Sequence, residues 1–296
     1  MTNIVKIDNI KYNKLLIRYK AFHLFKAKKT GKISELDKQR DLNIMSMDKQ
    51  RFIECCEKII NSNREKCGIG TLGEKTLHAV LKNYFEPYTA NHEVRMGSFV
   101  ADIVGENGIV EIQTGNFNKL RKKLESFLEV TTVTVVYPIP STKWIVWIDD
   151  STGEVTDKRK SPKRGSPFEA FFELYKIKPF LTHENFRLCI VMIDIIEYRK
   201  LDGWSEDRKK GSSRYERIPV DIIDEIYIDN KWDFTKLIPH DMPKSFTSKD
   251  FKKLSALSLK KAQTAMNVLQ YIGVIKQIGK AGRLHLYEKQ ADYVAL

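Results

Sequence analysis

The sequence predicts a mixed α/β protein, in which helices flank a mixed β-sheet, followed by a small α+β domain at the C-terminus. Two short apolar runs meet at a glycine-containing turn within residues 99–114, which is typical of a β-hairpin. Segments with apolar residues at helical spacing lie before and after that hairpin. From residue 239 the pattern changes to two short helices followed by a second hairpin.

Length and composition set limits on the class of protein. A chain of 296 residues can bury a sizeable core and hold more than one domain. We predict a basic helical region over residues 1–66, a central α/β domain over residues 67–238 and a C-terminal domain over residues 239–296. No apolar run approaches the roughly 18 residues that cross a bilayer, and the N-terminus lacks the apolar stretch of a signal peptide. The four cysteines show no CxxC pairing, which indicates free thiols in a reducing, cytoplasmic setting. Because no apolar run is long enough to cross a bilayer, we expect no membrane partner.

The positive charge is unevenly distributed along the chain. The net charge is +13, and residues 1–50 carry 12 Lys and Arg against 5 Asp and Glu. Residues 231–296 also carry 12 against 5, whereas the middle of the chain is balanced. A polyanion that is bound at the ends and processed in the middle would suit this distribution. The alternative is that lysine is simply a common surface residue.

Helices are expected on both sides of the hairpin. One is predicted over Met47 to Ile60, and another over Gly73 to Phe85 with Glu74 near its start. After the hairpin, residues 116–128 are typical of a helix that is basic on one side. The β-branched run from Val130 to Tyr137 suits a buried strand.

Two prolines and a basic stretch follow. Pro138 and Pro140 are expected to end the strand, so that Lys143 to Ile148 forms a separate one. Lys158 to Arg164 holds five cations in seven residues, which predicts an exposed loop that either contacts phosphates or is merely solvated. A long apolar strand is predicted over Phe186 to Tyr198.

The polar residues of the first hairpin are few and ordered. Asp102 lies in its first strand, and Glu111 and Gln113 lie in its second. Side chains alternate across a strand, so Glu111 and Gln113 are expected on one face. If the hairpin pairs in register, Asp102 lies opposite them. Three polar groups would then converge on one side of an otherwise apolar ribbon.

This arrangement resembles the PD-(D/E)xK, or restriction-endonuclease-like, nuclease superfamily over residues 70–137. In that family an acidic residue on the first helix, an Asp on the second strand and a Glu-x-Lys on the third strand build a divalent-metal site. The matching positions in this chain are Glu74, Asp102, Glu111 and Gln113. The resemblance implies that Glu74, Asp102 and Glu111 bind the metal, and it departs from the family at Gln113, where lysine is usual.

The chemistry implied by the resemblance is phosphodiester hydrolysis. A divalent ion held by Asp102 and Glu111 would activate water and neutralise charge on the phosphate, and oxygen ligands suit Mg²⁺. Gln113 carries no charge and cannot carry a proton near neutral pH. Such an enzyme is expected to be slow or to favour Mn²⁺. Three cations just after the site are candidate phosphate contacts: Arg121, Lys122 and Lys123.

The C-terminal segment resembles a winged helix-turn-helix domain over residues 244–288. Thr247 or Ser248 can cap a first helix, Ser258 can cap a second one from Leu259 to Ile272, and a hairpin with a glycine-containing tip follows. In that family the second helix enters a major groove and the wing contacts the backbone, although many winged helices bind protein. The resemblance implies DNA contacts from the second helix and the wing, namely Lys260, Lys261, Gln263, Thr264, Asn267, Lys280 and Arg283.

Three hypotheses follow from the sequence. The first is a metal-dependent DNA endonuclease with a DNA-binding winged helix. A double-strand cutter normally needs two active sites, which leaves a homodimer open. The second is a catalytically inactive DNA-binding or regulatory protein on a nuclease-like scaffold, and Gln113 is its best support. The third is a structural role in which the winged helix contacts protein.

Overall fold

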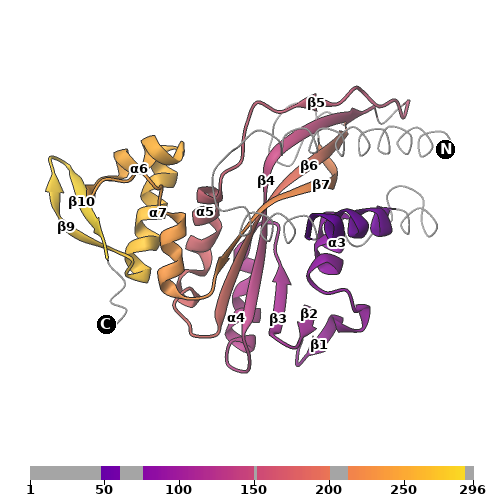
Figure 1. The fold of residues 1–296 in the computed structure, drawn as a ribbon, viewed down its shortest axis with the longest axis horizontal. Coiled ribbons are helices and arrows are strands. Elements are labelled where there is room, and N and C mark those ends of the chain that lie inside the picture. Colours follow the sequence, from indigo (N-terminus) through magenta and orange to yellow (C-terminus); the bar gives the residue numbers. More distant parts are fainter. Residues whose placement is uncertain (1–47, 61–75, 150–151, 201–212, 291–296) are drawn as a thin grey trace, which may run out of the picture. The chain divides into compact units, whose positions relative to one another are not determined.

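The computed structural model describes residues 48–60, 76–149, 152–200 and 213–290, and within them the chain is mixed α/β (Figure 1). These residues pack into two compact units. The larger unit comprises His78–Thr142, Lys163–Asp194 and the described part of Ile222–Leu296. The smaller unit comprises the described parts of Lys143–Pro162 and Ile195–Asp221 together with the described residues before His78.

A mixed sheet has the strand order β1-β2-β3-β4-β6-β7, with β5 paired to β4. The β1–β2 and β2–β3 pairs are antiparallel, whereas β3 and β4 are parallel, so the predicted mixed sheet is confirmed. The strands are β1 (His92–Met96), β2 (Phe99–Gly105), β3 (Gly108–Ile112), β4 (Val133–Ile148), β5 (Arg159–Lys160), β6 (Phe186–Lys200) and β7 (Ser213–Ile228).

The predicted first hairpin is confirmed. Strands β2 and β3 pair from Gly105 with Gly108 to Ile103 with Val110. Gly108 has φ of +105°, and a Cβ atom there would clash with the carbonyl oxygen of Thr132. Only glycine allows this backbone conformation and this close approach, so Gly108 fixes where β3 begins.

The prediction that two prolines end the fourth strand was wrong. Strand β4 runs through Pro138 and Pro140 without a break, and residues 143–148 are its second half. The carbonyl of Val136 accepts a hydrogen bond from the N–H of Gln113, at the end of β3. Backbone groups alternate in direction along a strand, so the nitrogens of Pro138 and Pro140 face the same edge, past the end of β3. A missing N–H there removes no hydrogen bond to β3.

The basic stretch after β4 is also more ordered than expected. Arg159 and Lys160 form β5, which pairs antiparallel with Trp144 and Ile145 of β4. A short paired strand therefore replaces part of the predicted loop.

Helices and 3₁₀ turns make up most of the other described residues before the C-terminal elements. The predicted helix over residues 116–128 is a 3₁₀ turn followed by a short α-helix. Residues 48–60 are helical, as predicted, and Glu74 lies outside the described residues. The elements are α3 (Thr76–Phe85), η1 (Thr89–Asn91), η2 (Phe117–Leu120), α4 (Arg121–Phe127), η3 (Pro167–Ala170), α5 (Phe171–Leu174), η4 (Tyr175–Phe180) and η5 (Lys231–Leu237).

The C-terminal elements follow the predicted order of two helices and a hairpin. Thr247 and Asp250 form a capping box at the first helix, and Ser258 caps the second. A short strand before the helices joins the hairpin in a three-stranded sheet of order β8-β10-β9. The elements are β8 (Ser245–Phe246), α6 (Ser248–Ser255), α7 (Leu259–Ile272), β9 (Ile275–Ala281) and β10 (Leu284–Lys289).

The two units have separate apolar clusters. In the larger unit the C-terminal elements share one core with the rest, because the buried ring of Phe251 packs edge-on against Phe168 and Phe171. The smaller unit has a cluster centred on Val146, Ile196 and Val220. None of the helices in the described residues is both long and apolar enough to span a membrane.

Candidate active site

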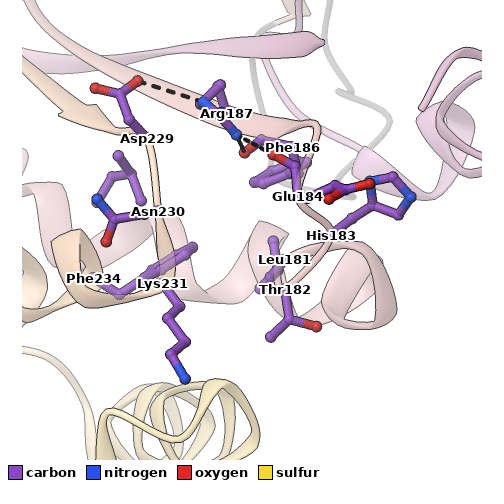
Figure 2. Close-up of a pocket in the computed structure, with 11 residues that line it drawn as sticks. Leu181, Thr182, His183, Glu184, Phe186, Arg187, Asp229, Asn230, Lys231 and Phe234 are labelled. Carbon is purple, nitrogen blue, oxygen red and sulfur yellow. Dashed lines mark hydrogen bonds and ion pairs between the residues drawn. The ribbon is translucent and has the colours of Figure 1, made fainter. Parts of the chain in front are cut away.

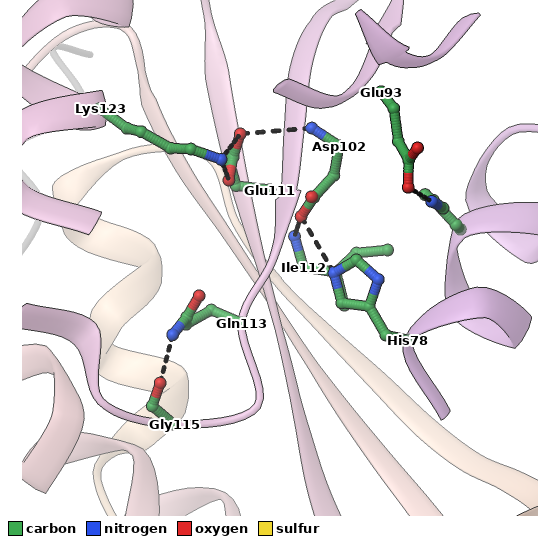
Figure 3. A network of polar contacts seen from close by, with 9 residues as sticks. His78, Glu93, Asp102, Glu111, Ile112, Gln113, Gly115 and Lys123 are labelled. Carbon is green, nitrogen blue, oxygen red and sulfur yellow. Dashed lines mark hydrogen bonds and ion pairs between the residues drawn. The ribbon is translucent and has the colours of Figure 1, made fainter. Parts of the chain in front are cut away.

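Two acidic side chains meet where the β2–β3 ladder stops. Asp102 and Glu111 lie one position beyond the last paired residues, Ile103 and Val110, with Asp102 just before Ile103 and Glu111 just after Val110. The N–H of Asp102 donates to Glu111 Oε1 at 3.4 Å, and the N–H of Ile112 donates to Asp102 Oδ2 at 2.8 Å (Figure 3). The two carboxylates accept these backbone N–H groups in place of carbonyl oxygens, which fixes both side chains at the end of the ladder.

Lys123 on α4 binds the second of these carboxylates. Its Nζ lies 3.0 Å from Oε1 and 2.8 Å from Oε2 of Glu111. Leu124 and Phe127 are buried on the same helix and hold it against the core. The sequence predicted a phosphate contact for Lys123, and the structure places its ammonium group on Glu111. A cation therefore lies beside Glu111 although residue 113 is a glutamine and not a lysine.

His78 on α3 contacts the first carboxylate. Its Nε2 lies 3.2 Å from Oδ2 of Asp102, and its side chain is partly exposed (Figure 3). His78 was not among the site residues predicted from the sequence. A signal was present, because His78 follows Glu74 by four residues and such residues share a helix face.

The two carboxyl groups have pKa values shifted in opposite directions. Burial and then the charge of Asp102 raise the pKa of Glu111 to about 7, although Lys123 acts against both. Burial would also raise the pKa of Asp102, but His78, the Ile112 N–H and Lys123 together lower it. Neighbouring carboxyl groups with pKa values pushed apart are typical of sites that handle protons or cations.

Gln113 does not converge with the two acids. Strand β3 ends one residue earlier, at Ile112, and the Gln113 amide nitrogen donates to the carbonyl oxygen of Gly115 (Figure 3). The chain turns here, with φ of +152° at Gly115 and +53° at Asn116. Strand alternation therefore no longer directs the side chain of residue 113 onto the face of Glu111.

The other cations predicted near the site lie elsewhere. Arg121 donates from Nη1 to the carbonyl oxygen of Lys176 at 2.9 Å, and its guanidinium lies over the ring of Phe180. It therefore ties the start of α4 to η4. Lys122 is exposed to solvent.

A shallow pocket of about 290 Å³ lies elsewhere in the larger unit, between the start of β6 and the end of β7 (Figure 2). Arg187 lines it and lies 4.0 Å from Asp229. The same guanidinium donates to the carbonyl oxygens of Glu184 and Phe186. The arginine of this pocket is already engaged in an ion pair and in hydrogen bonds. Asp102 and Glu111 are therefore kept as the candidate active site.

Comparison with known proteins matches residues 75–229 to a family described as Domain of unknown function (DUF8091). The chain belongs to the DUF8091 family. An uncharacterized protein of Treponema pallidum (strain Nichols) is 31% identical over 231 residues, which cover 75% of this chain and 88% of that protein. No solved structure matches this chain. The DUF8091 segment contains Asp102, Glu111, Lys123 and His78, so the whole described site belongs to the family domain.

The predicted DNA-contacting face of α7 lies outside the DUF8091 segment and is partly used within the larger unit. Lys261 lies 3.7 Å from Glu169, and Asn267 accepts a hydrogen bond from Lys178 at 3.1 Å. The Thr264 hydroxyl donates to its own helix, to the carbonyl of Lys260. The predicted residues that are exposed are Lys260, Gln263, Asn267, Lys280 and Arg283.

Proposed function

We propose that this protein is a metal-dependent DNA endonuclease, in which Asp102 and Glu111 hold a divalent cation and Lys123 supplies the positive charge that residue 113 lacks. One observation carries the proposal. At the end of the β2–β3 ladder, two carboxylates meet and an ammonium group lies 2.8 Å from one of them. Two acids on adjacent strands and a lysine beside them supply three of the four groups that the resemblance to PD-(D/E)xK nucleases implies, although this lysine comes from α4 and not from the third strand.

The residues of the site fit Mg²⁺ or Mn²⁺. Both are hard cations that take carboxylate oxygens and keep several waters or phosphate oxygens as further ligands. Oδ2 of Asp102 accepts hydrogen bonds, whereas none reaches its Oδ1 from the described residues. The raised pKa of Glu111 indicates a carboxylate short of positive charge, which a cation would supply. Within the described residues no three acidic, His or Cys side chains form a metal cluster, and Glu74 remains the predicted third ligand.

The side chains around the cation position have separate tasks. A divalent ion bound there supplies an activated water and neutralises charge on the phosphate. His78 and the Ile112 N–H hold Oδ2 of Asp102, which orients its other oxygen. Lys123 keeps part of Glu111 ionised near neutral pH, and its third N–H donor can reach a phosphate oxygen.

A cleavage assay tests the proposal. Supercoiled, linear and branched DNA are incubated with Mg²⁺ or Mn²⁺ and the parent protein, Asp102→Ala, Glu111→Ala or Lys123→Met. We expect each variant to lose at least ~100-fold in rate, because a charged group at the reacting phosphate is removed. Lys231→Met, at an exposed lysine that is not among the predicted nucleic-acid contacts, is the control and is expected to cut at the parent rate. Cleavage that survives both acid variants and a chelator would contradict the proposal.

A second candidate is a DNA-binding protein without catalysis. It is favoured by the contact of Lys123 with both oxygens of Glu111 and by the direction of Gln113 toward Gly115. DNA binding by the parent without cleavage on any substrate would support it. We propose that binding in either case uses the exposed residues of α7 and of the β9–β10 tip.

A further inference from the structure

Three exposed aromatic side chains lie on neighbouring helical segments of the larger unit. Phe172 and Tyr175 are each 50% exposed, and Tyr271 is 48% exposed. Phe172 and Tyr175 are three residues apart in the run from α5 into η4, a spacing that puts both side chains on one helix face. Tyr271 comes from α7, which packs against α5 and η4 (Figure 1).

Two lysines connect these rings. Nζ of Lys178 lies 5.3 Å from the centre of the Tyr175 ring and 4.7 Å from the centre of the Tyr271 ring. Nζ of Lys176 lies 4.9 Å from the centre of the Phe172 ring. One ammonium group therefore reaches both tyrosines, although they are far apart in the sequence. We call these five side chains the aromatic strip.

The two lysines differ in how their charge is compensated. Lys176 forms an ion pair with Glu173 at 2.6 Å. Lys178 donates to the side-chain oxygen of Asn267 at 3.1 Å, and it forms no ion pair with any of the described residues. The strip therefore has a positive charge beside two exposed rings, and no described carboxylate compensates it.

The rings of the strip are not part of the core. Other residues of the same segments pack inward, namely Phe171, Leu174, Ile177, Met266, Leu269 and Ile272. An aromatic ring that stays half exposed gains only part of the free energy that burial would provide. Apolar rings that gather on a surface and are rimmed by polar groups are typical of a binding site.

We propose that the aromatic strip binds single-stranded DNA, with unpaired bases stacked on its rings and a phosphate on Lys178. A partner for this surface must offer flat apolar faces and negative charge together, and every nucleotide of a single strand offers both. The bases of a duplex stack on one another and cannot reach the rings. An acidic peptide has the charge without the flat faces. The choice of DNA rests on the proposed function, whereas the stacking surface does not.

Binding of the full-length protein to a labelled strand of 30 thymidine nucleotides, and to its duplex with the complementary strand, tests the proposal. Fluorescence anisotropy is measured in EDTA, so that no cleavage occurs, over a range of salt concentrations. We expect Tyr271→Ala to raise Kd for the single strand about 5- to 100-fold, because a base loses its stacking partner. Binding of the duplex is expected to stay unchanged. Lys178→Gln is expected to lower the salt slope on the single strand by about 0.7.

Further variants make the test specific. Tyr271→Phe keeps the ring, so it is expected to bind like the parent. Tyr88→Ala removes a tyrosine that is 73% exposed and lies outside the strip, and this matched control is also expected to bind like the parent. If Tyr271→Ala loses its fold by circular dichroism, Phe172→Ala and Tyr175→Ala replace it, with the same expected loss.

Four results would overturn the proposal. The first is the absence of single-strand binding by the parent at low salt, or an unchanged Kd in Tyr271→Ala. The second is an equal loss on the single strand and the duplex, which would mean that the strip contacts only the backbone. The third is tighter binding of a strand of 30 uridine nucleotides, which would assign the strip to RNA. The fourth is a parent dimer that dissociates in Tyr271→Ala during analytical ultracentrifugation, which would assign the strip to a second copy of the chain.

Failure of this proposal is distinguished from failure of the proposed nuclease. Asp102→Ala is expected to bind the single strand like the parent, because the aromatic strip does not include that residue. Binding that depends on Tyr271 without cleavage of any DNA would contradict the nuclease alone. Cleavage by a protein whose binding is unchanged in Tyr271→Ala would contradict the role of the strip alone.

Discussion

Glu111 and Glu197 are two strand carboxylates in the same degree of burial, 2% and 0% exposed, and yet they titrate in opposite directions. The pKa of Glu111 is raised to about 7, and that of Glu197 is lowered to about 2. Burial pushes both values upward, so burial cannot explain the difference. The neighbouring charges decide it.

The charges around Glu111 and Glu197 differ in sign and number. Glu111 has one cation, Lys123, and a second carboxylate, Asp102, so a further positive charge would be stabilising there. Glu197 has four cations within 4 Å, so its negative charge is fully compensated in the folded protein. The comparison therefore favours the proposed cation site at Glu111 and leaves no such need at Glu197.

Removal of each carboxylate charge is expected to give the largest difference in the free energy of unfolding between the two sites. At pH 7, Glu197→Gln is expected to lower the free energy of unfolding by about 3–5 kcal/mol, because four cations lose their buried partner. Glu111→Gln is expected to change it by less than about 1 kcal/mol, because an amide satisfies a site where the charge is disfavoured. Urea unfolding of both variants measures this. Equal losses in the two variants would show that burial, and not the neighbours, governs both sites.

The contributions of Glu111 and Glu197 to stability are expected to depend on pH in opposite directions. The folded pKa of Glu111 is above its ordinary value of 4.5, so its contribution is fully present below pH 4.5 and is lost as pH rises through about 7. The folded pKa of Glu197 is depressed, so its contribution is present above pH 4.5 and is lost as pH falls toward about 2. Each contribution amounts to about 3 kcal/mol.

Urea unfolding of the parent and of Glu111→Gln from pH 3 to pH 8 checks the first of these windows. The stability of the parent relative to Glu111→Gln is expected to fall between pH 4.5 and pH 7. A difference that stays constant across this range would contradict the raised pKa of Glu111.

Stabilisation by the metal is expected to be smaller than either of the two differences between Glu111 and Glu197 described above. Mg²⁺ or Mn²⁺ at ten times its Kd should stabilise the parent by about 1.4 kcal/mol, since only the folded state holds both carboxylates together. Thermal unfolding with and without the ion measures this. Asp102→Ala is expected to show no shift, whereas Glu197→Gln is expected to show the shift of the parent. A shift that persists in Asp102→Ala would place the cation elsewhere.

Local patterns predicted the elements that depend on neighbours in the chain. The hairpin around Gly108, the capped helix that begins after Ser258 and the pairing of Asp102 with Glu111 all follow from residues close in sequence. The long strand β4 did not, because the effect of Pro138 and Pro140 depends on where another strand ends. Neither did the contact of Lys123 with Glu111, because the sequence predicted the same phosphate-contacting role for Lys123 as for Arg121 and Lys122.

The sequence by itself determined the fold class, the hairpin and the two acids, because strand alternation and turn chemistry act over a few residues. Only the tertiary structure decided which cation meets which carboxylate. Lys123 and Glu111 are brought together by the packing of α4, and the four cations around Glu197 come from three different strands. Electrostatic interactions depend on distance in space and on burial, and a chain shows neither until it is folded.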